Sequence, residues 1–258
     1  MEAILQWDGQ ALLFIQEYLR QDWMDRFWTT ITHLGDAGWF WIILGIVLLI
    51  PKKTRKAGIA ALAALVIGAL ITNVALKNMV ARIRPYEVVD GLKLLIEPQP
   101  DFSFPSGHTC ASIGAAVAMY SFLEKKWGVL LLALAVLISL SRLYVGVHYP
   151  TDVIGGAITG IFAAWAAVKG VKIWSLKGCK SVFPVSLAMD DRIVEKVKIK
   201  ISSRRSAAIW YWVLLEIFLV IIISGFVDCF ASQLNAKALK GTDINIGQHH
   251  RSVSLTSV

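Results

Sequence analysis

Six apolar segments recur along the 258-residue chain, each separated from the next by a polar connection. Each is close to the roughly 20 residues that a helix needs to cross the hydrocarbon core of a bilayer. They are Phe27–Ile50, Ala57–Met79, Gly107–Leu123, Gly128–Val147, Asp152–Val168 and Ala207–Cys229. The pattern therefore predicts an all-α fold, a polytopic helical bundle with about six membrane spans.

The first 26 residues show a different pattern. Apolar residues are interleaved with Glu2, Asp8 and Glu17 as far as Arg20, which predicts an amphipathic helix in the membrane interface. Arg20 is the first basic residue, so the positively charged start of a cleavable signal is missing. We expect five parts: an interfacial segment 1–26, a membrane core 27–169, a basic linker 170–205, a further span 206–230 and a polar, disordered tail 231–258.

Composition agrees with a membrane protein. Hydrophobic residues make up 56% of the chain and charged residues 17%, whereas about 25% of the residues in soluble domains are charged. The three cysteines, Cys110, Cys179 and Cys229, have no metal-ligand spacing. We therefore expect neither a metal nor a cofactor.

The net charge of +8 is distributed unevenly between alternate connections. Sixteen basic residues lie in one set and eight in the other, where ten acidic residues accompany them. The richer set is "PKKTRK", "EKKW" and Lys169–Arg205, and the poorer set is Met1–Arg26, Val80–Pro105 and the tail after Cys229. Basic connections remain in the cytoplasm, so the richer set is predicted to face inward and to contact anionic lipid. The charge thus indicates topology in the cell membrane and argues against nucleic-acid binding.

Lys77 and Arg84 form the first of several ionisable groups at the outward ends of spans, where charge is costly and points to function. Seven residues are about two helical turns, so the two side chains share a face if the helix persists and Pro85 ends it. Two cations on one face suit a phosphate, although snorkelling at a helix end is the alternative. Arg82 lies off that face and is expected to snorkel.

The second group is "PSGH", Pro105–His108, directly before an apolar segment. Ser106 can cap a helix, and Gly107 lets a ligand approach the backbone. The free N–H groups at such a helix start bind anions. His108 is either part of this cap or a proton donor.

The third group is "SRLYVGVHYPTD", which contains Arg142, His148 and Asp152. Asp152 is four residues beyond His148 and can accept a hydrogen bond from one imidazole nitrogen, leaving the other free as a nucleophile or base. A structural histidine cap is the alternative. A weaker fourth group is "THLGDAG", in which His33 and Asp36 either support the site or are ordinary interfacial polar residues.

These motifs resemble the phosphatidic acid phosphatase type 2 superfamily. That family's three signatures are a Lys separated by six residues from Arg-Pro, then Pro-Ser-Gly-His, then Ser-Arg with a His and an Asp at fixed spacing. The chain fills every position in "KNMVARIRP", "PSGH" and "SRLYVGVHYPTD". The resemblance covers roughly residues 31–169.

The resemblance implies a metal-independent phosphatase with a phosphohistidine intermediate. His148 would attack phosphorus and Asp152 would orient it, while His108 would protonate the leaving oxygen. The expected phosphate-binding residues are Lys77, Arg84, Ser106, Gly107 and Arg142. The chain departs from six-span members of the family in having two predicted spans before the first motif and one after the third.

The resemblance also implies a lipid phosphate substrate at the outer membrane surface. Undecaprenyl diphosphate is the favoured substrate, with phosphatidylglycerophosphate and phosphatidic acid as rivals. A non-catalytic protein that binds or transports lipid phosphate is the alternative of another class, and intact His108, His148 and Asp152 argue against it. A homodimer is a base-rate expectation only.

Overall fold

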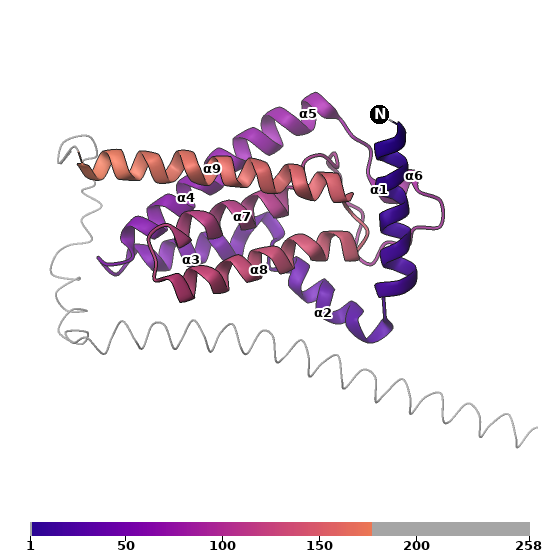
Figure 1. Cartoon of the computed structure of the whole chain (residues 1–258), viewed down its shortest axis with the longest axis horizontal. Helices are drawn as coiled ribbons and strands as arrows, with labels where there is room; N and C mark the ends of the chain where they lie inside the picture. The colour runs from indigo at the N-terminus through magenta and orange to yellow at the C-terminus, as the bar shows by residue number, and fades with distance from the viewer. Residues whose placement is uncertain (1, 177–258) are drawn as a thin grey trace, which may run out of the picture. The chain divides into compact units, whose positions relative to one another are not determined.

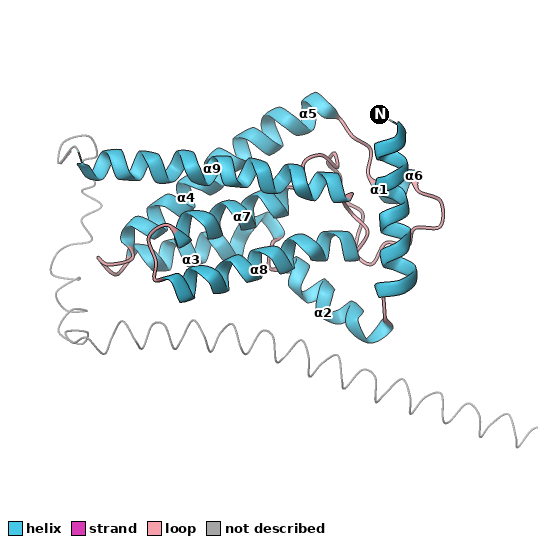
Figure 2. Ribbon diagram, in the orientation of Figure 1, coloured by secondary structure: helices cyan, strands magenta, loops and turns pink. Residues whose placement is uncertain are grey.

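A computed structural model of the chain describes residues 2–176. The predicted linker beyond Leu176, the sixth span Ala207–Cys229 and the polar tail lie outside the described residues. Within the described residues the chain is helical, with no strand (Figure 2). This confirms the predicted fold class.

Twelve helical segments follow one another in the described residues. They are α1 (Glu2–Phe14), η1 (Ile15–Leu19), α2 (Asp22–His33), η2 (Asp36–Gly38), α3 (Trp39–Leu49), α4 (Arg55–Ala69), η3 (Leu70–Leu76), α5 (Lys77–Val80), α6 (Pro85–Val88), α7 (Gly107–Tyr120), α8 (Lys125–Tyr144) and α9 (Pro150–Leu176).

Five of the predicted spans coincide with helices, and the first is broken. Segments Arg55–Val88, Lys125–Tyr144 and Pro150–Ser175 are long and apolar enough to cross a membrane. The predicted span Phe27–Ile50 is the pair α2 and α3, bent by 43° at a turn where Ala37 and Gly38 have positive φ. The third span corresponds to α7, which has only 14 residues. The count of six spans therefore stays a prediction.

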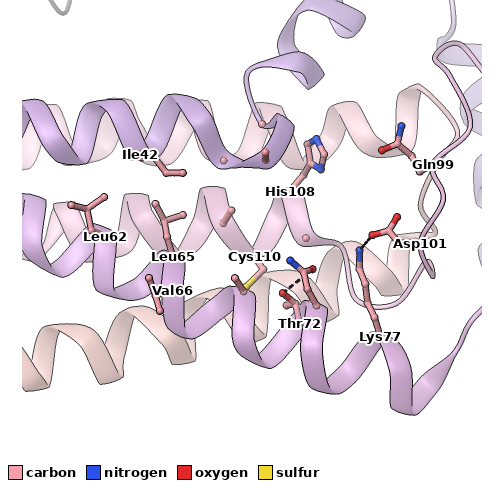
Figure 3. Close-up of a pocket in the computed structure, with 17 residues that line it drawn as sticks. Ile42, Leu62, Leu65, Val66, Thr72, Lys77, Gln99, Asp101, His108 and Cys110 are labelled. Carbon is pink, nitrogen blue, oxygen red and sulfur yellow. Dashed lines mark hydrogen bonds and ion pairs between the residues drawn. The ribbon is translucent and has the colours of Figure 1, made fainter.

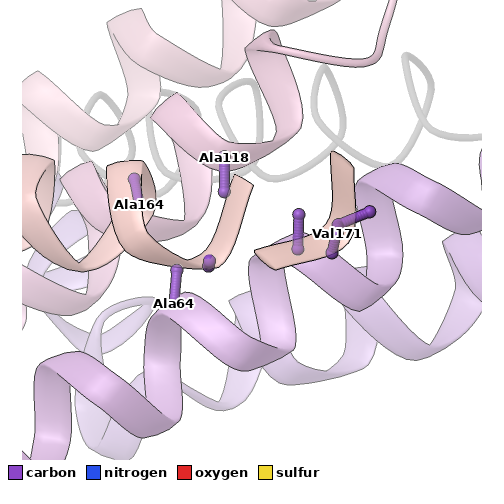
Figure 4. Close-up of a cluster of buried hydrophobic side chains, with 6 residues drawn as sticks. Ala64, Ala118, Ala164 and Val171 are labelled. Atoms are coloured by element: carbon purple, nitrogen blue, oxygen red, sulfur yellow. The ribbon is translucent and has the colours of Figure 1, made fainter. Parts of the chain in front are cut away.

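Helix α7 packs against α4, α8 and α9, and small residues line these contacts. A cluster of buried side chains joins α4, α7 and α9 (Figure 4). It comprises Ala60, Ala64, Ala118, Ala164, Ala167 and Val171. Small residues let helices approach closely in a membrane, where the hydrophobic effect does not drive helices together.

The N-terminal parts of α7 and α9 approach closely at two glycines of α9. A Cβ at Gly156 would lie 2.5 Å from the Ser106 carbonyl oxygen, and one at Gly160 would lie 2.6 Å from that of Cys110. Neither position tolerates a side chain without separating the helices. This contact places "PSGH" beside the start of α9, which carries Asp152.

Two of the basic connections meet at the opposite end of these helices. Lys53, before α4, forms an ion pair with Glu124 before α8 at 3.2 Å. Lys56 donates to Ser175 at the end of α9 at 2.8 Å. The prediction that these connections share one side of the bundle is confirmed.

Helix α1 lies across the end of the bundle where α9 begins (Figure 1). Gln16 Nε2 donates to the Gly91 carbonyl at 2.9 Å, and Arg20 Nε donates to that of Tyr144 at 2.7 Å. The side chains of Trp7 and Phe14 are exposed, and the interfacial location of this segment stays a prediction. Asp8, however, is fully buried.

Candidate functional site

The three sequence motifs meet at the end of the bundle covered by α1. Lys77 begins α5, Arg84 precedes α6, Arg142 lies in the last turn of α8, and His148 precedes α9. These residues and Asp152 are between 0% and 6% exposed. Snorkelling toward water does not account for charged side chains buried this deeply.

Lys77 and Arg84 converge, although not for the predicted reason. The helix ends at Val80, Ala81 is left-handed with φ 46°, and Pro85 begins α6 instead of ending a helix. The two cations therefore do not share a helix face. They meet at Asp101, whose carboxylate accepts from Lys77 Nζ through one oxygen and from Arg84 Nη2 through the other.

Asp101 was not singled out from the sequence. Partial burial alone would raise its pKa, but the hydrogen bond from Lys77 and the charges of Lys77 and Arg84 outweigh burial and lower the pKa to about 2. The carboxylate is therefore ionised at neutral pH, and its single negative charge offsets one of the two positive charges of Lys77 and Arg84. Its position just before "PSGH" was the only available signal.

Ser106 and Gly107 begin α7 as predicted. Ser106 is the N-cap, and its hydroxyl accepts from the Thr109 amide at 3.4 Å. The Ser106 amide donates to the Asp152 carbonyl at 3.0 Å, which ties this turn to α9. The first amides of α7 lie at the site end of the helix and, together with its dipole, favour an anion there.

His108 is held by the break between α2 and α3. Its Nε2 lies 2.9 Å from Asp36 Oδ1, and Asp36 Oδ2 lies 2.7 Å from His33 Nδ1. A Cβ at Gly35 would be 2.6 Å from the His108 ring, so the glycine makes room for it. The structure therefore brings the fourth group predicted from the sequence, "THLGDAG", into contact with the second.

The Arg142 guanidinium has hydrogen-bond donors without a partner among the described residues. Its Nη1 donates to Thr32 Oγ1 at 2.6 Å, but the buried Nε and Nη2 have no partner among the described residues. Buried donors are rarely left unsatisfied, and each costs about 1–3 kcal/mol. Two unused guanidinium donors in this position indicate a site for an anion.

His148 presents its two ring nitrogens to different partners. Nδ1 lies 3.5 Å from Asp152 Oδ2, just beyond ordinary hydrogen-bond length, and Nε2 lies 3.5 Å from Arg84 Nη1. Burial lowers the pKa of His148 to about 3; Asp152 opposes this effect, whereas Arg142 and Arg84 add to it. The imidazole is therefore neutral at pH 7 and can act as a nucleophile.

Asp152 is fully buried and has three further donors. Oδ1 accepts from Arg82 Nη1 at 2.8 Å, and Oδ2 accepts from Ser103 Oγ and from the Tyr149 amide at 2.9 Å. The prediction that Arg82 snorkels is wrong, because its guanidinium also binds buried Asp8. Asp8 and Ser103 were missed because neither belongs to a recognisable motif.

A cavity of about 560 Å³ reaches the site at Lys77, Asp101 and His108 (Figure 3). Its apolar part is lined by Ile42 of α3 and by Leu62, Leu65 and Val66 of α4. Its polar part is lined by Asn73, Lys77, Asp101 and His108. A molecule with an apolar tail and an anionic head matches this division.

No group of three metal-ligating side chains occurs among residues 2–176. Three cationic side chains, Lys77, Arg84 and Arg142, lie at the site, and the Asp101 carboxylate pairs with the first two. Together with the amides of α7 they can bind an oxyanion through charge-assisted hydrogen bonds. A neutral imidazole lies next to them.

Comparisons with known proteins agree with this arrangement. The sequence model described as the PAP2 superfamily matches residues 57–175. An undecaprenyl-diphosphatase of Sulfolobus acidocaldarius is 39% identical over 143 residues, which are 55% of this chain and 67% of that protein. Phosphatidylglycerophosphatase B of Bacillus subtilis is 36% identical over 157 residues, 55% of this chain and 73% of that protein.

A solved structure is also similar. The crystal structure of Aquifex aeolicus LpxE superposes with a TM-score of 0.55 and 28% sequence identity, covering 61% of this chain and 93% of that one. Helices α1, α2 and α3 all precede the matched residues 57–175.

Proposed function

Because this chain belongs to the PAP2 superfamily, we propose that it is an integral membrane phosphatase that removes a terminal phosphate from a lipid. The observation that carries the proposal is the cavity. It joins a part lined by apolar side chains of α3 and α4 to a polar part lined by Lys77, Asp101 and His108. A lipid chain fits the first part and a phosphate the second.

The phosphate would be held by three side chains and one helix start. Lys77 and Arg84 would exchange Asp101 for phosphate oxygens, and Arg142 would use its free Nε and Nη2 donors. The Gly107 amide would complete the set, whereas the Ser106 amide already donates to the Asp152 carbonyl. Phosphoryl transfer depends mainly on positioning and charge stabilisation, which cationic side chains supply here. We therefore propose that the reaction needs no metal.

His148 is the proposed nucleophile. Nε2 would attack phosphorus while Asp152 accepts from Nδ1–H, so an N–P bond forms as the P–O bond to the lipid breaks. His108 would give its proton to the leaving oxygen, with Asp36 stabilising its charged form. Water would then attack the phosphohistidine, His108 would take the water proton, and phosphate would leave.

Undecaprenyl diphosphate is the proposed substrate, yielding undecaprenyl phosphate. Support comes from the Sulfolobus relative, which carries the name undecaprenyl-diphosphatase. The similar Bacillus phosphatidylglycerophosphatase makes phosphatidylglycerophosphate the second candidate. Phosphatidic acid shares the same head chemistry.

A parallel phosphate-release assay tests this function. Purified protein in detergent micelles with excess chelator should release phosphate from undecaprenyl diphosphate. We expect its kcat/KM to exceed those for phosphatidylglycerophosphate and phosphatidic acid by at least tenfold. A strict magnesium requirement would contradict the metal-free reaction, and a preference for another lipid would reassign the substrate.

The proposed site faces outward from the cell membrane. Support comes from the basic connections at the opposite end, which are predicted to stay in the cytoplasm. In a background with Cys179 and Cys229 replaced by serine, Pro100→Cys should react with an impermeant maleimide in intact cells. Ser175→Cys should react only after permeabilisation, and the reverse pattern would invert the topology.

A further inference from the structure

Asp8 of helix α1 is fully buried beside the start of α9. Its Oδ1 accepts from the Thr151 amide at 3.1 Å, and its Oδ2 accepts from the Thr151 hydroxyl and from Arg82 Nη2, the latter at 2.6 Å. Helix α1 lies outside the residues that match the superfamily model. The contact therefore joins a segment outside those matched residues to Thr151, the residue that precedes Asp152.

Arg82 lies between two carboxylates. Nη2 binds Asp8, and Nη1 binds both Thr151 Oγ1 at 2.7 Å and Asp152 Oδ1 at 2.8 Å. Its guanidinium carbon is 3.9 Å from the centre of the Tyr149 ring. The guanidinium is thus fixed on one face by an aromatic ring and on two edges by acids.

The two oxygens of Asp152 have separate partners. Oδ1 accepts from Arg82, whereas Oδ2 faces His148 Nδ1 and also accepts from Ser103 and the Tyr149 amide. An uncompensated guanidinium on Oδ1 would draw negative charge away from the imidazole. Asp8 supplies the second negative charge that balances it.

We propose that Asp8 is a positioning residue for phosphoryl transfer: it compensates Arg82 and so keeps the Asp152 carboxylate available to stabilise positive charge on His148. Positive charge develops on that imidazole when Nε2 bonds to phosphorus. The charges then alternate along Asp8, Arg82, Asp152 and His148. The inference rests on the proposed phosphatase function.

Anchoring of α1 does not by itself account for a buried acid. Gln16 bonds to Gly91 and Lys93, and Arg20 bonds to Tyr144 and Lys93, so other contacts attach this segment. Buried ion pairs often contribute no more stability than apolar groups of similar size. An Asn at position 8 can still accept from the Thr151 amide but carries no charge.

Asp8→Asn tests the charge. The kcat of the purified full-length variant should fall about tenfold. This is the lower end of the loss seen when a residue that hydrogen-bonds to and orients a functional side chain is removed. KM should stay within twofold, because Asp8 lies remote from the phosphate. Asp8→Glu should recover at least a third of the wild-type kcat. The matched control is Glu17→Gln, which removes an exposed acid from the same segment and should behave as wild type.

A double-mutant cycle with Arg82→Gln tests whether Asp8 acts through Arg82. If Asp8 acts by compensating Arg82, Asp8→Asn should change kcat less than twofold in a protein that already carries Arg82→Gln. An equal loss in both backgrounds overturns the inference, as does wild-type kcat for Asp8→Asn. Circular dichroism melting, compared at equal folded concentration, separates lost charge from lost fold.

If the Asp8→Asn variant does not fold, a second pair of variants tests the same inference. Thr151→Val removes the hydroxyl that joins Asp8 and Arg82, whereas Thr151→Ser keeps it. We expect kcat to fall about threefold in Thr151→Val and to change little in Thr151→Ser. Equal kcat values for these two variants would overturn the inference. Absence of phosphatase activity in the wild type would instead reject the proposed function.

Discussion

His148→Ala is expected to lower phosphate release from the lipid substrate by about 10⁴-fold or more, since removing a nucleophile abolishes the covalent route altogether. The imidazole is buried and neutral, and its Nε2 lies beside Arg84. Substrate binding should change little, because the cations proposed to hold the phosphate remain. Single-turnover kinetics with a detergent-solubilised diphosphate lipid measure the loss.

The covalent intermediate supplies an independent measurement. Rapid acid-free quenching with substrate labelled in its terminal phosphate should give base-stable, acid-labile label on wild-type protein and none on His148→Ala. His249→Ala, in the predicted tail, is the matched control and should keep full activity. Turnover or labelling that survives His148→Ala would remove this residue as the nucleophile.

His108→Asn should show a loss that depends on the leaving group. General-acid catalysis contributes about 10²–10⁴-fold when the leaving oxygen needs a proton. We expect a fall of about 10³-fold with a lipid phosphate. With p-nitrophenyl phosphate, whose leaving group departs as a stable anion, the fall should be less than about tenfold. Steady-state kinetics on both substrates with one preparation make the comparison.

The structure explains why this variant is informative. His108 lines the cavity and is held by Asp36, so asparagine keeps a polar side chain there without a titratable proton. Equal losses on both substrates would mean that His108 binds phosphate instead of protonating the leaving group. Asp36→Asn should show the same selectivity for the lipid substrate, but with a smaller loss.

The helices and the main catalytic candidates could be predicted from the sequence because their signals are local. Apolar runs of membrane length mark the spans, and Ser106 marks the start of α7 by capping chemistry. The four-residue spacing of His148 and Asp152 gives a face-to-face pair once Pro150 begins a helix. Each inference needed only neighbouring residues.

Contacts between distant segments could not be predicted. Arg82 was expected in solvent because its partner Asp8 lies 74 residues earlier in another helix. The common face of Lys77 and Arg84 assumed a continuous helix, but the chain leaves helical geometry at Ala81. Loop residue Asp101, not helix periodicity, brings those cations together.

Under the proposed function, Asp101 makes substrate entry an exchange of counter-ions on Lys77 and Arg84. Lys77 and Arg84 already hold one carboxylate, so an arriving anion must offer more than a single negative charge to displace it. The phosphodiester of an ordinary phospholipid carries one negative charge, the same as the Asp101 carboxylate. Its exchange for that carboxylate would therefore bring no gain in electrostatic energy. A terminal phosphate carries up to two negative charges. The bound carboxylate would thus disfavour binding of the phosphodiester lipids that make up most of the bilayer. The return of Asp101 to Lys77 and Arg84 would help to expel inorganic phosphate after each turnover.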